Sequence, residues 1–176
     1  MHRYLQRAWE RIDETVGSMS ALDLSADRPG KWTAAEILEH LTLAFTGTRI
    51  GLEKALASGE LRARTPVLRQ RLARTAVTDF GYFPPVKAPE PTLPRGSIPA
   101  GAAVAAAKDA LRALDGTLSQ VAGRFGSRAR VSNHPYFGGL TVDQWRKFHW
   151  RHTHHHMKQI SNARGRQRGP SESPGV

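Results

Sequence analysis

Cysteine is absent from the sequence of 176 residues. Its absence excludes disulfide bonds, a cysteine nucleophile and thiolate ligands for a metal ion. Long apolar runs are also absent, because apolar residues make up 39% of the chain and no uninterrupted stretch approaches the roughly 20 residues of a membrane helix. The N-terminus becomes amphipathic soon after His2, without the apolar region of a secretory signal. We therefore expect a soluble protein without a membrane partner, in the cytoplasm by default.

Acidic residues are scarce relative to basic ones. The chain has 15 Asp and Glu against 26 Lys and Arg, which gives a net charge of +11. Such a charge attracts nucleic acid without making it a specific partner. The basic residues are not interleaved with aromatic side chains in the pattern that stacks bases. We interpret the charge as a solvated surface and keep a basic nucleic-acid-associated module as an alternative.

Apolar periodicity predicts four helices and no strand. Apolar residues recur every three or four positions in residues 2–19, from Thr33 onward, from about residue 97 to 125, and in residues 141–160. Residues 23–31 and 133–139 are expected to be loops. These patterns favour an all-α protein built as a four-helix bundle. We expect one domain in residues 1–164 and a basic, polar, disordered tail in residues 165–176.

Local signals indicate where the helices begin. Thr33 and Glu36 form a capping-box pattern, and Thr141 and Gln144 repeat it before the last helix. Ser97 is expected to cap the third helix.

A proline-rich connection separates the second and third helices. Seven of the eleven prolines fall in residues 66–99, with room for one short helix in residues 61–77. A connection this long can cross the full bundle, so that the second and third helices run parallel. Residues 79–98 would then shape the entrance to a site.

Histidine is concentrated in the last helix, where five of the eight histidines lie in residues 149–156. His152 and His156 are one helical turn apart and share a face, close enough to bind one metal ion. His40 lies among the apolar positions of the second helix. Because no thiolate is present, nitrogen and oxygen atoms must hold any metal. Three imidazoles at His40, His152 and His156 would hold a divalent ion and leave a coordination position open.

Other residues near these histidines leave alternatives open. His149 shares the face of His152 and could replace His40, although ligands from two helices close around an ion more readily. Glu36 is a candidate catalytic base or partner of His40, with capping as its competing role. His134 could line the open side of the site or only fix its loop. Gln159 could hydrogen-bond a ligand ring.

The two remaining histidines of the last helix are expected outside the ligand set. His155 would lie beside the ligands, and His154 would be exposed.

Three segments together resemble the DinB-like superfamily, and the resemblance spans nearly the whole chain. It rests on Gly30-Lys31-Trp32-Thr33-x-x-Glu36-Ile37-Leu38-x-His40-Leu41, His134-Pro135-x-Phe137-Gly138-x-Leu140-Thr141 and His152-x-x-x-His156-x-x-Gln159-Ile160. It implies a four-helix bundle whose second helix gives one histidine and whose fourth gives a His-x-x-x-His pair to a divalent metal. Those ligands correspond to His40, His152 and His156.

The resemblance also implies a range of activities. Related branches include thiol-dependent S-transferases and isomerases that use small thiols, and metal-dependent hydrolases. We therefore expect a metal-dependent hydrolase or thiol-dependent S-transferase that binds Zn²⁺ or Ni²⁺ and acts on a small molecule, with a low-molecular-weight thiol as a possible partner. A non-catalytic, stress-associated metal-binding bundle is the alternative, and a homodimer remains open.

Overall fold

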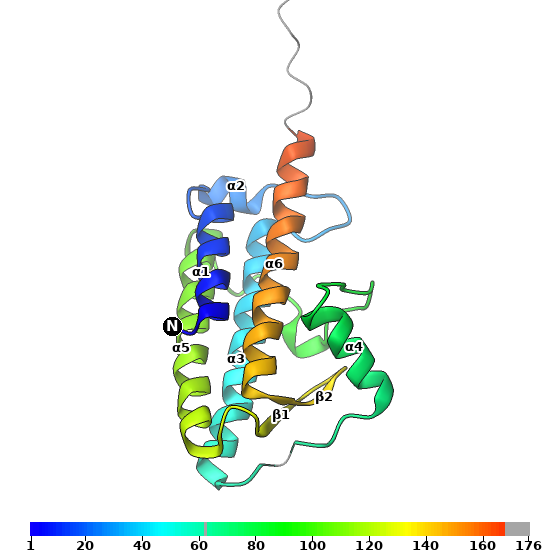
Figure 1. The fold of residues 1–176 in the computed structure, drawn as a ribbon. Helices are drawn as coiled ribbons and strands as arrows, with labels where there is room; N and C mark the ends of the chain where they lie inside the picture. The colour runs from blue at the N-terminus through cyan, green and yellow to red at the C-terminus, as the bar shows by residue number, and fades with distance from the viewer. Residues whose placement is uncertain (62, 168–176) are drawn as a thin grey trace, which may run out of the picture.

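A computed structural model of the chain describes residues 1–61 and 63–167. This part of the chain is mostly helical, so the all-α expectation holds approximately (Figure 1). Its elements in chain order are α1 (Arg3–Val16), α2 (Ala21–Ser25), α3 (Ala34–Ser58), α4 (Leu68–Thr78), the 3₁₀ turn η1 (Glu90–Thr92), α5 (Ala100–Phe125), β1 (Arg130–His134), β2 (Gly138–Thr141) and α6 (Val142–Gln167).

The four long helices α1, α3, α5 and α6 lie side by side, and the long connection lets α3 and α5 run parallel (Figure 1). Near the C-terminal ends of both helices, Arg124 of α5 donates to the carbonyl of Leu56 in α3 at 2.7 Å. At their N-terminal ends, Glu39 of α3 accepts hydrogen bonds from the residues that precede α5. These two contacts confirm the predicted parallel crossover.

The core follows directly from the apolar periodicity of the long helices. Side chains three or four positions apart share one face of a helix, and this face turns inward. In α1 the stripe of Leu5, Ala8 and Ile12 is fully buried. Burying each large apolar side chain stabilises the fold by about 1.5–3 kcal/mol, so the stripes hold the helices together. In α3 and α5 the fully buried residues include Phe45 and Leu111.

The first helical region is shorter than predicted, and part of the expected loop is helical. α1 ends at Val16 instead of continuing to residue 19. Ser20 and Asp23 then form a reciprocal capping box that begins α2, with bonds of 3.0 and 3.1 Å between side chains and backbone. The cap satisfies backbone donors locally and permits a five-residue helix, of which residues 23–25 lie in the expected loop.

Both predicted capping boxes are present. The Thr33 amide donates to Glu36 at 2.7 Å while the Glu36 amide donates to the Thr33 hydroxyl at 3.2 Å. Thr141 and Gln144 are bonded in the same way before α6, at 3.0 and 3.2 Å.

The predicted Ser97 cap is wrong. Pro99 occupies the N-cap position of α5 without a side-chain bond, and the Ser97 hydroxyl instead donates to Glu39.

The expected loop at residues 133–139 is part of an antiparallel β-hairpin, so the prediction of no strand is wrong. β1 and β2 pair with His134 opposite Gly138. Contacts far apart in sequence hold the hairpin: the Gly139 amide donates to the Arg64 carbonyl at 3.0 Å, and the Arg64 amide donates to Asn133 at 2.9 Å. A Cβ at Gly139 would lie 2.4 Å from the Arg64 carbonyl oxygen, so this approach requires glycine.

The end of the last helix also differs from the expectation. α6 continues to Gln167, so residues 165–167 of the predicted tail are helical. Residues 168–176 of that tail lie outside the described residues. Within the described part of the chain, no helix combines the length and the apolar character needed to cross a membrane.

Candidate metal centre

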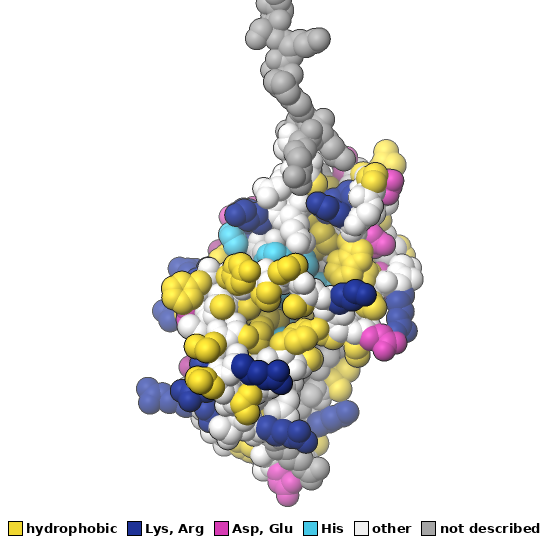
Figure 2. All heavy atoms as spheres, turned by 90° about the vertical axis from the view of Figure 1, so that its right-hand side faces the viewer, with side chains coloured by type: hydrophobic (Ala, Val, Ile, Leu, Met, Phe, Trp, Pro, Cys, Tyr) yellow, Lys and Arg dark blue, Asp and Glu magenta, His cyan; other side chains and the backbone are white. Residues whose placement is uncertain are grey.

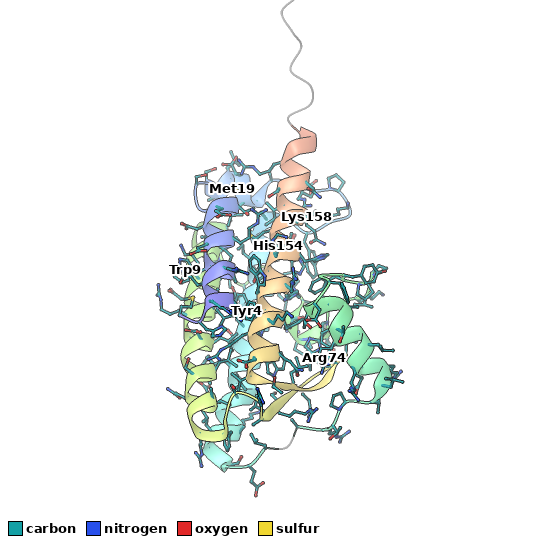
Figure 3. The ribbon with its side chains drawn as sticks, viewed as in Figure 1. Tyr4, Trp9, Met19, Arg74, His154 and Lys158 are labelled. Carbon is teal, nitrogen blue, oxygen red and sulfur yellow. The ribbon has the colours of Figure 1, made fainter. Side chains whose placement is uncertain are left out.

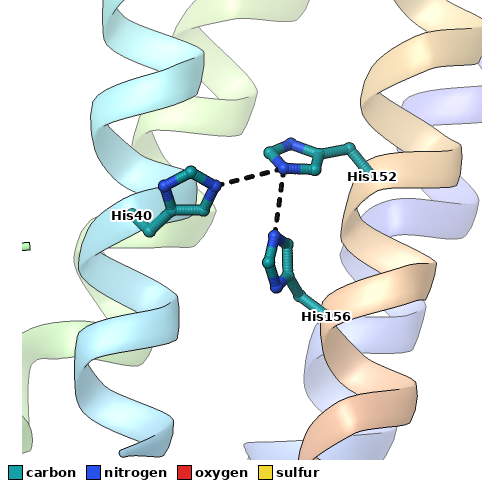
Figure 4. A group of neighbouring side chains, drawn as sticks. All are labelled: His40, His152 and His156. Atoms are coloured by element: carbon teal, nitrogen blue, oxygen red, sulfur yellow. Dashed lines mark hydrogen bonds between the residues drawn. The ribbon is translucent and has the colours of Figure 1, made fainter. Parts of the chain in front are cut away.

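Two helices bring His40, His152 and His156 together (Figure 4). His40 comes from α3, and His152 and His156 from successive turns of α6. All three side chains are buried, with 3%, 9% and 8% of their surface exposed. Nε2 of His152 lies 3.1 Å from Nε2 of His40 and 3.0 Å from Nε2 of His156. The three predicted ligands therefore meet at one point.

Their spacing fits a single divalent ion. The candidate ligand atoms lie within 4.8 Å of one another. Tetrahedral coordination at about 2.0–2.1 Å places ligand nitrogens about 3.3 Å apart. The two Nε2–Nε2 separations at His152, 3.1 and 3.0 Å, lie close to that spacing.

Hydrogen bonds at Nδ1 of His40 and His156 leave a lone pair on Nε2 of each ring, facing the other ligands. Nδ1 of His40 donates to the Thr92 carbonyl at 2.7 Å, and Nδ1 of His156 donates to the Gln159 side-chain oxygen at 2.9 Å. A neutral imidazole has one N–H, so Nε2 of both rings must be an acceptor. Both face Nε2 of His152, whose single proton can satisfy only one of them. A shared cation satisfies all three nitrogens.

Burial also favours the unprotonated rings that metal binding requires. Desolvation lowers the pKa of His40 below its ordinary value of 6.5 and lowers the pKa of His156 to about 3. The pKa of His152 is lowered well below 6.5, first by burial and then by the neighbouring imidazoles. At neutral pH protons therefore compete weakly for these ligand atoms.

Glu39, which was not predicted, anchors the crossover beside His40. Its carboxylate is 2% exposed and accepts bonds from the amides of Arg95, Gly96 and Ser97 at 3.2, 3.0 and 3.0 Å, and from the Ser97 hydroxyl at 2.5 Å. Burial alone raises the pKa of Glu39, but these hydrogen bonds lower it below its ordinary value. The anchored residues begin three positions after Thr92, and the Thr92 carbonyl orients His40.

His149, the alternative ligand, is not part of the cluster. Its side chain is fully buried, and its Nε2 lies 3.1 Å from the Thr48 hydroxyl. The Thr48 hydroxyl donates to the Ala44 carbonyl, so His149 donates to Thr48. The ring stacks on Trp145, with centroids 5.6 Å apart. His149 is therefore a core histidine of α6.

The two candidate catalytic groups have other contacts. Glu36 caps α3 and does not line the cavity outside the histidines. His134 lines that cavity, where it stacks on Phe137 with centroids 4.2 Å apart and accepts from the Tyr136 amide at 3.2 Å. Phe148 contacts both His134 and His152. His134 therefore forms part of the wall and fixes its turn.

The remaining histidines of α6 differ in their surroundings. His155 stacks on Phe83 at a centroid distance of 4.6 Å and bonds to Gln159 at 3.0 Å, which places it beside the ligands as expected. His154 is half-buried rather than exposed. It lies on the side of α6 that faces α1, away from the ligands (Figure 3). The burial arises because α1 packs along α6.

A cavity of about 1320 Å³ opens onto the histidine cluster. In Figure 2, hydrophobic side chains surround a hollow with histidines beside them and Lys and Arg around it. Among the described residues, no Asp or Glu lines the cavity, whereas four basic residues do. Within residues 79–98, Phe83 and Thr92 line the cavity. That this segment shapes the entrance stays a prediction.

Some of these residues had no signal in the sequence. Phe83 belongs to a proline-rich stretch without periodicity, and Thr92 acts through its backbone carbonyl. Glu39 did give a signal, because it is a carboxylate inside the apolar start of α3.

A family model described as "Protein of unknown function (DUF1569)" matches residues 1–163. Comparison with curated proteins and with solved structures gave no match.

Proposed function

The chain belongs to the DUF1569 family, and we propose that it is a metal-dependent enzyme that acts on a small molecule. His40, His152 and His156 would hold a divalent ion, with Zn²⁺ and Ni²⁺ as the first choices. The convergence of three buried Nε2 atoms at an open cavity carries the proposal. The proposal includes a four-helix bundle of the DinB-like type, which the four long helices and the ligand positions on α3 and α6 support.

The open cavity favours catalysis over a structural metal. Structural zinc sites usually have four protein ligands, whereas catalytic sites have three and an open position. Here three histidines converge, and the side chains around them leave a cavity large enough for a small organic molecule. The non-catalytic, stress-associated bundle is therefore the weaker candidate.

Thiol transfer is the reaction that the cavity walls favour. When bound, the metal ion would lower the pKa of a coordinated thiol or water molecule. Hydrolysis also benefits from a carboxylate that moves protons, and the described lining contains none. In the proposed transfer, the thiol sulfur forms a bond to an electrophilic carbon, the bond to the leaving group breaks, and the thiol proton leaves with that group.

The chain contributes orientation and exclusion of water. Thr92 and Gln159 hold the rings of His40 and His156 by their outer nitrogens. Phe83 and Phe148 both stack on the His152 ring, at centroid distances of 5.9 and 5.2 Å. These aromatic side chains restrict solvent beside the ligand atoms and give the substrate an apolar surface.

The partner predictions extend this proposal. We propose a small-molecule substrate together with a low-molecular-weight thiol, a cytoplasmic location, and no specific nucleic-acid or membrane partner. The homodimer stays a prediction.

Metal content and turnover test the proposal together. The purified protein, His40→Ala and His156→Ala would be analysed for bound metal by mass spectrometry. His154→Ala is the matched control, because it removes an imidazole from the same helix outside the cluster. We expect about one ion per chain in the parent and control, and loss of most metal in the other two variants.

A substrate screen follows with a small thiol plus an electrophile, and separately with esters and amides. We expect thiol conjugation that stops on chelation and returns with Zn²⁺ or Ni²⁺. If the protein turns over only esters, the proposed reaction is hydrolysis instead of thiol transfer. Full metal retention in both ligand variants would overturn the proposed site.

A further inference from the structure

The cavity outside the histidines combines apolar walls with positively charged side chains. Its basic lining residues are Arg28, Lys31, Arg69 and Lys87, and no carboxylate lines it among the described residues. The exposed side chains of Lys31, Arg69 and Lys87 make no hydrogen bond or ion pair in the described part of the chain. Elsewhere, Lys108 pairs with Asp13 at 2.7 Å.

The apolar part of the cavity extends to its mouth. Tyr82, Val86 and Tyr136 line it, and 62%, 58% and 43% of their surfaces are exposed. The Tyr136 hydroxyl donates to the Lys87 carbonyl at 2.9 Å, which joins the hairpin to the crossover across this mouth. Large exposed apolar side chains around a cavity are typical of a binding surface for an apolar group.

A metal ion bound by the three histidines would add positive charge to the cavity. The three imidazoles are neutral ligands, so a bound divalent ion would keep its full positive charge. Among the described residues, the cavity lining supplies no negative charge to offset it. When the charges that line a cleft have one sign and its walls are apolar, the electric field is focused there and molecules of the opposite charge are concentrated.

We propose that this cavity binds an amphipathic organic anion, such as a medium-chain carboxylate or an aryl sulfonate. The apolar body would lie against Phe83, Tyr82 and Phe137, and the anionic group would face Lys31, Arg69 and Lys87 at the mouth. The inference deepens the proposed function by naming the class of substrate, and its charged contacts do not require the metal.

Binding can be measured on the metal-free full chain. The probe is 1-anilinonaphthalene-8-sulfonate, and N-phenyl-1-naphthylamine is its neutral counterpart without the sulfonate. Fluorescence titrations would use both probes in chelator at neutral pH, with decanoate and decanol as competitors. We expect tighter binding of the sulfonate than of the neutral probe, and stronger competition by decanoate than by decanol.

Lysine variants locate the charge effect. Lys31→Gln combined with Lys87→Gln should weaken sulfonate binding about tenfold, since exposed charge pairs contribute about threefold each. The same double variant should leave the neutral probe unchanged. Lys54→Gln on α3 is the matched control, because Lys54 is exposed and does not line the cavity. Unchanged thermal unfolding of each variant would establish that folding is intact.

Two results would overturn the inference. One is equal affinity for the charged and neutral probes. The other is equal loss of sulfonate binding in Lys54→Gln and in the double variant, which would assign the effect to overall charge. If the probes bind selectively but the purified protein binds no metal at the histidine cluster, the proposed enzyme is overturned and this inference stands. If the histidine cluster binds metal but the probes show no selectivity, this inference is overturned and the proposed enzyme stands.

Discussion

Replacing His149 by Gln should remove part of the acid sensitivity of the fold. His149 is fully buried, and desolvation, with a smaller contribution from His134, lowers its pKa to about 3 from 6.5. In the unfolded chain the ring regains an ordinary pKa near 6.5. Below that pH the unfolded state therefore binds a proton that the folded state excludes.

The sign and size of the effect follow from proton linkage. The stability contributed by the neutral, buried ring is intact above pH 6.5 and is lost as the pH falls toward 3. A shift of one pKa unit corresponds to about 1.4 kcal/mol. Between pH 7 and pH 5, His149 alone should lower the free energy of unfolding by about 2 kcal/mol.

Urea denaturation of the parent and His149→Gln at pH 7 and pH 5 measures this difference. Both proteins are kept metal-free with a chelator, so that coordination does not contribute. The other histidines titrate in both proteins and cancel in the comparison. We expect the parent to lose about 2 kcal/mol more than the variant over this interval. Equal losses would refute the assignment of His149 as a neutral core residue.

Three further substitutions separate the support of the site from the stability of the fold. Glu39→Gln should destabilise the metal-free protein by about 2–4 kcal/mol, because it removes charge-assisted bonds to a buried carboxylate, and urea denaturation measures this. It should also weaken metal binding about tenfold or more in competition with a chelating dye, since the crossover positions the partner of His40. Gln159→Ala should weaken metal binding about 10–100-fold with little change in unfolding, and unchanged affinity would remove Gln159 from the support of His156. Thr33→Ala should cost about 1 kcal/mol of stability through loss of the helix cap and leave metal affinity intact. A comparable loss of metal in this variant would mean that destabilisation alone explains the weaker metal binding of Glu39→Gln.

Features set by local chemistry could be predicted from the sequence. The caps at Thr33 and Thr141 depend on residues three positions away, and both form as predicted. His152 and His156 meet because the helix fixes their separation. The placement of His40 beside them depends on the packing of α3 against α6, and the apolar stripe of α3 already indicated which way His40 faces.

Features set by long-range contacts could not be predicted. The hairpin looked like a loop because its strands are short and contain Gly138 and Gly139, and contacts with Arg64 stabilise it. The role of Ser97 as a donor to Glu39 likewise depends on a contact 58 residues away. Neither the pairing of such residues nor the backbone carbonyl at Thr92 leaves a periodic pattern in the sequence.

The most direct test of the metal centre is anomalous X-ray diffraction from crystals of the protein saturated with Zn²⁺, recorded on both sides of the zinc absorption edge. The proposed site predicts one strong peak about 2.0–2.1 Å from Nε2 of His40, His152 and His156. A fully loaded crystal with zinc only elsewhere, and no peak among these three rings, would contradict it.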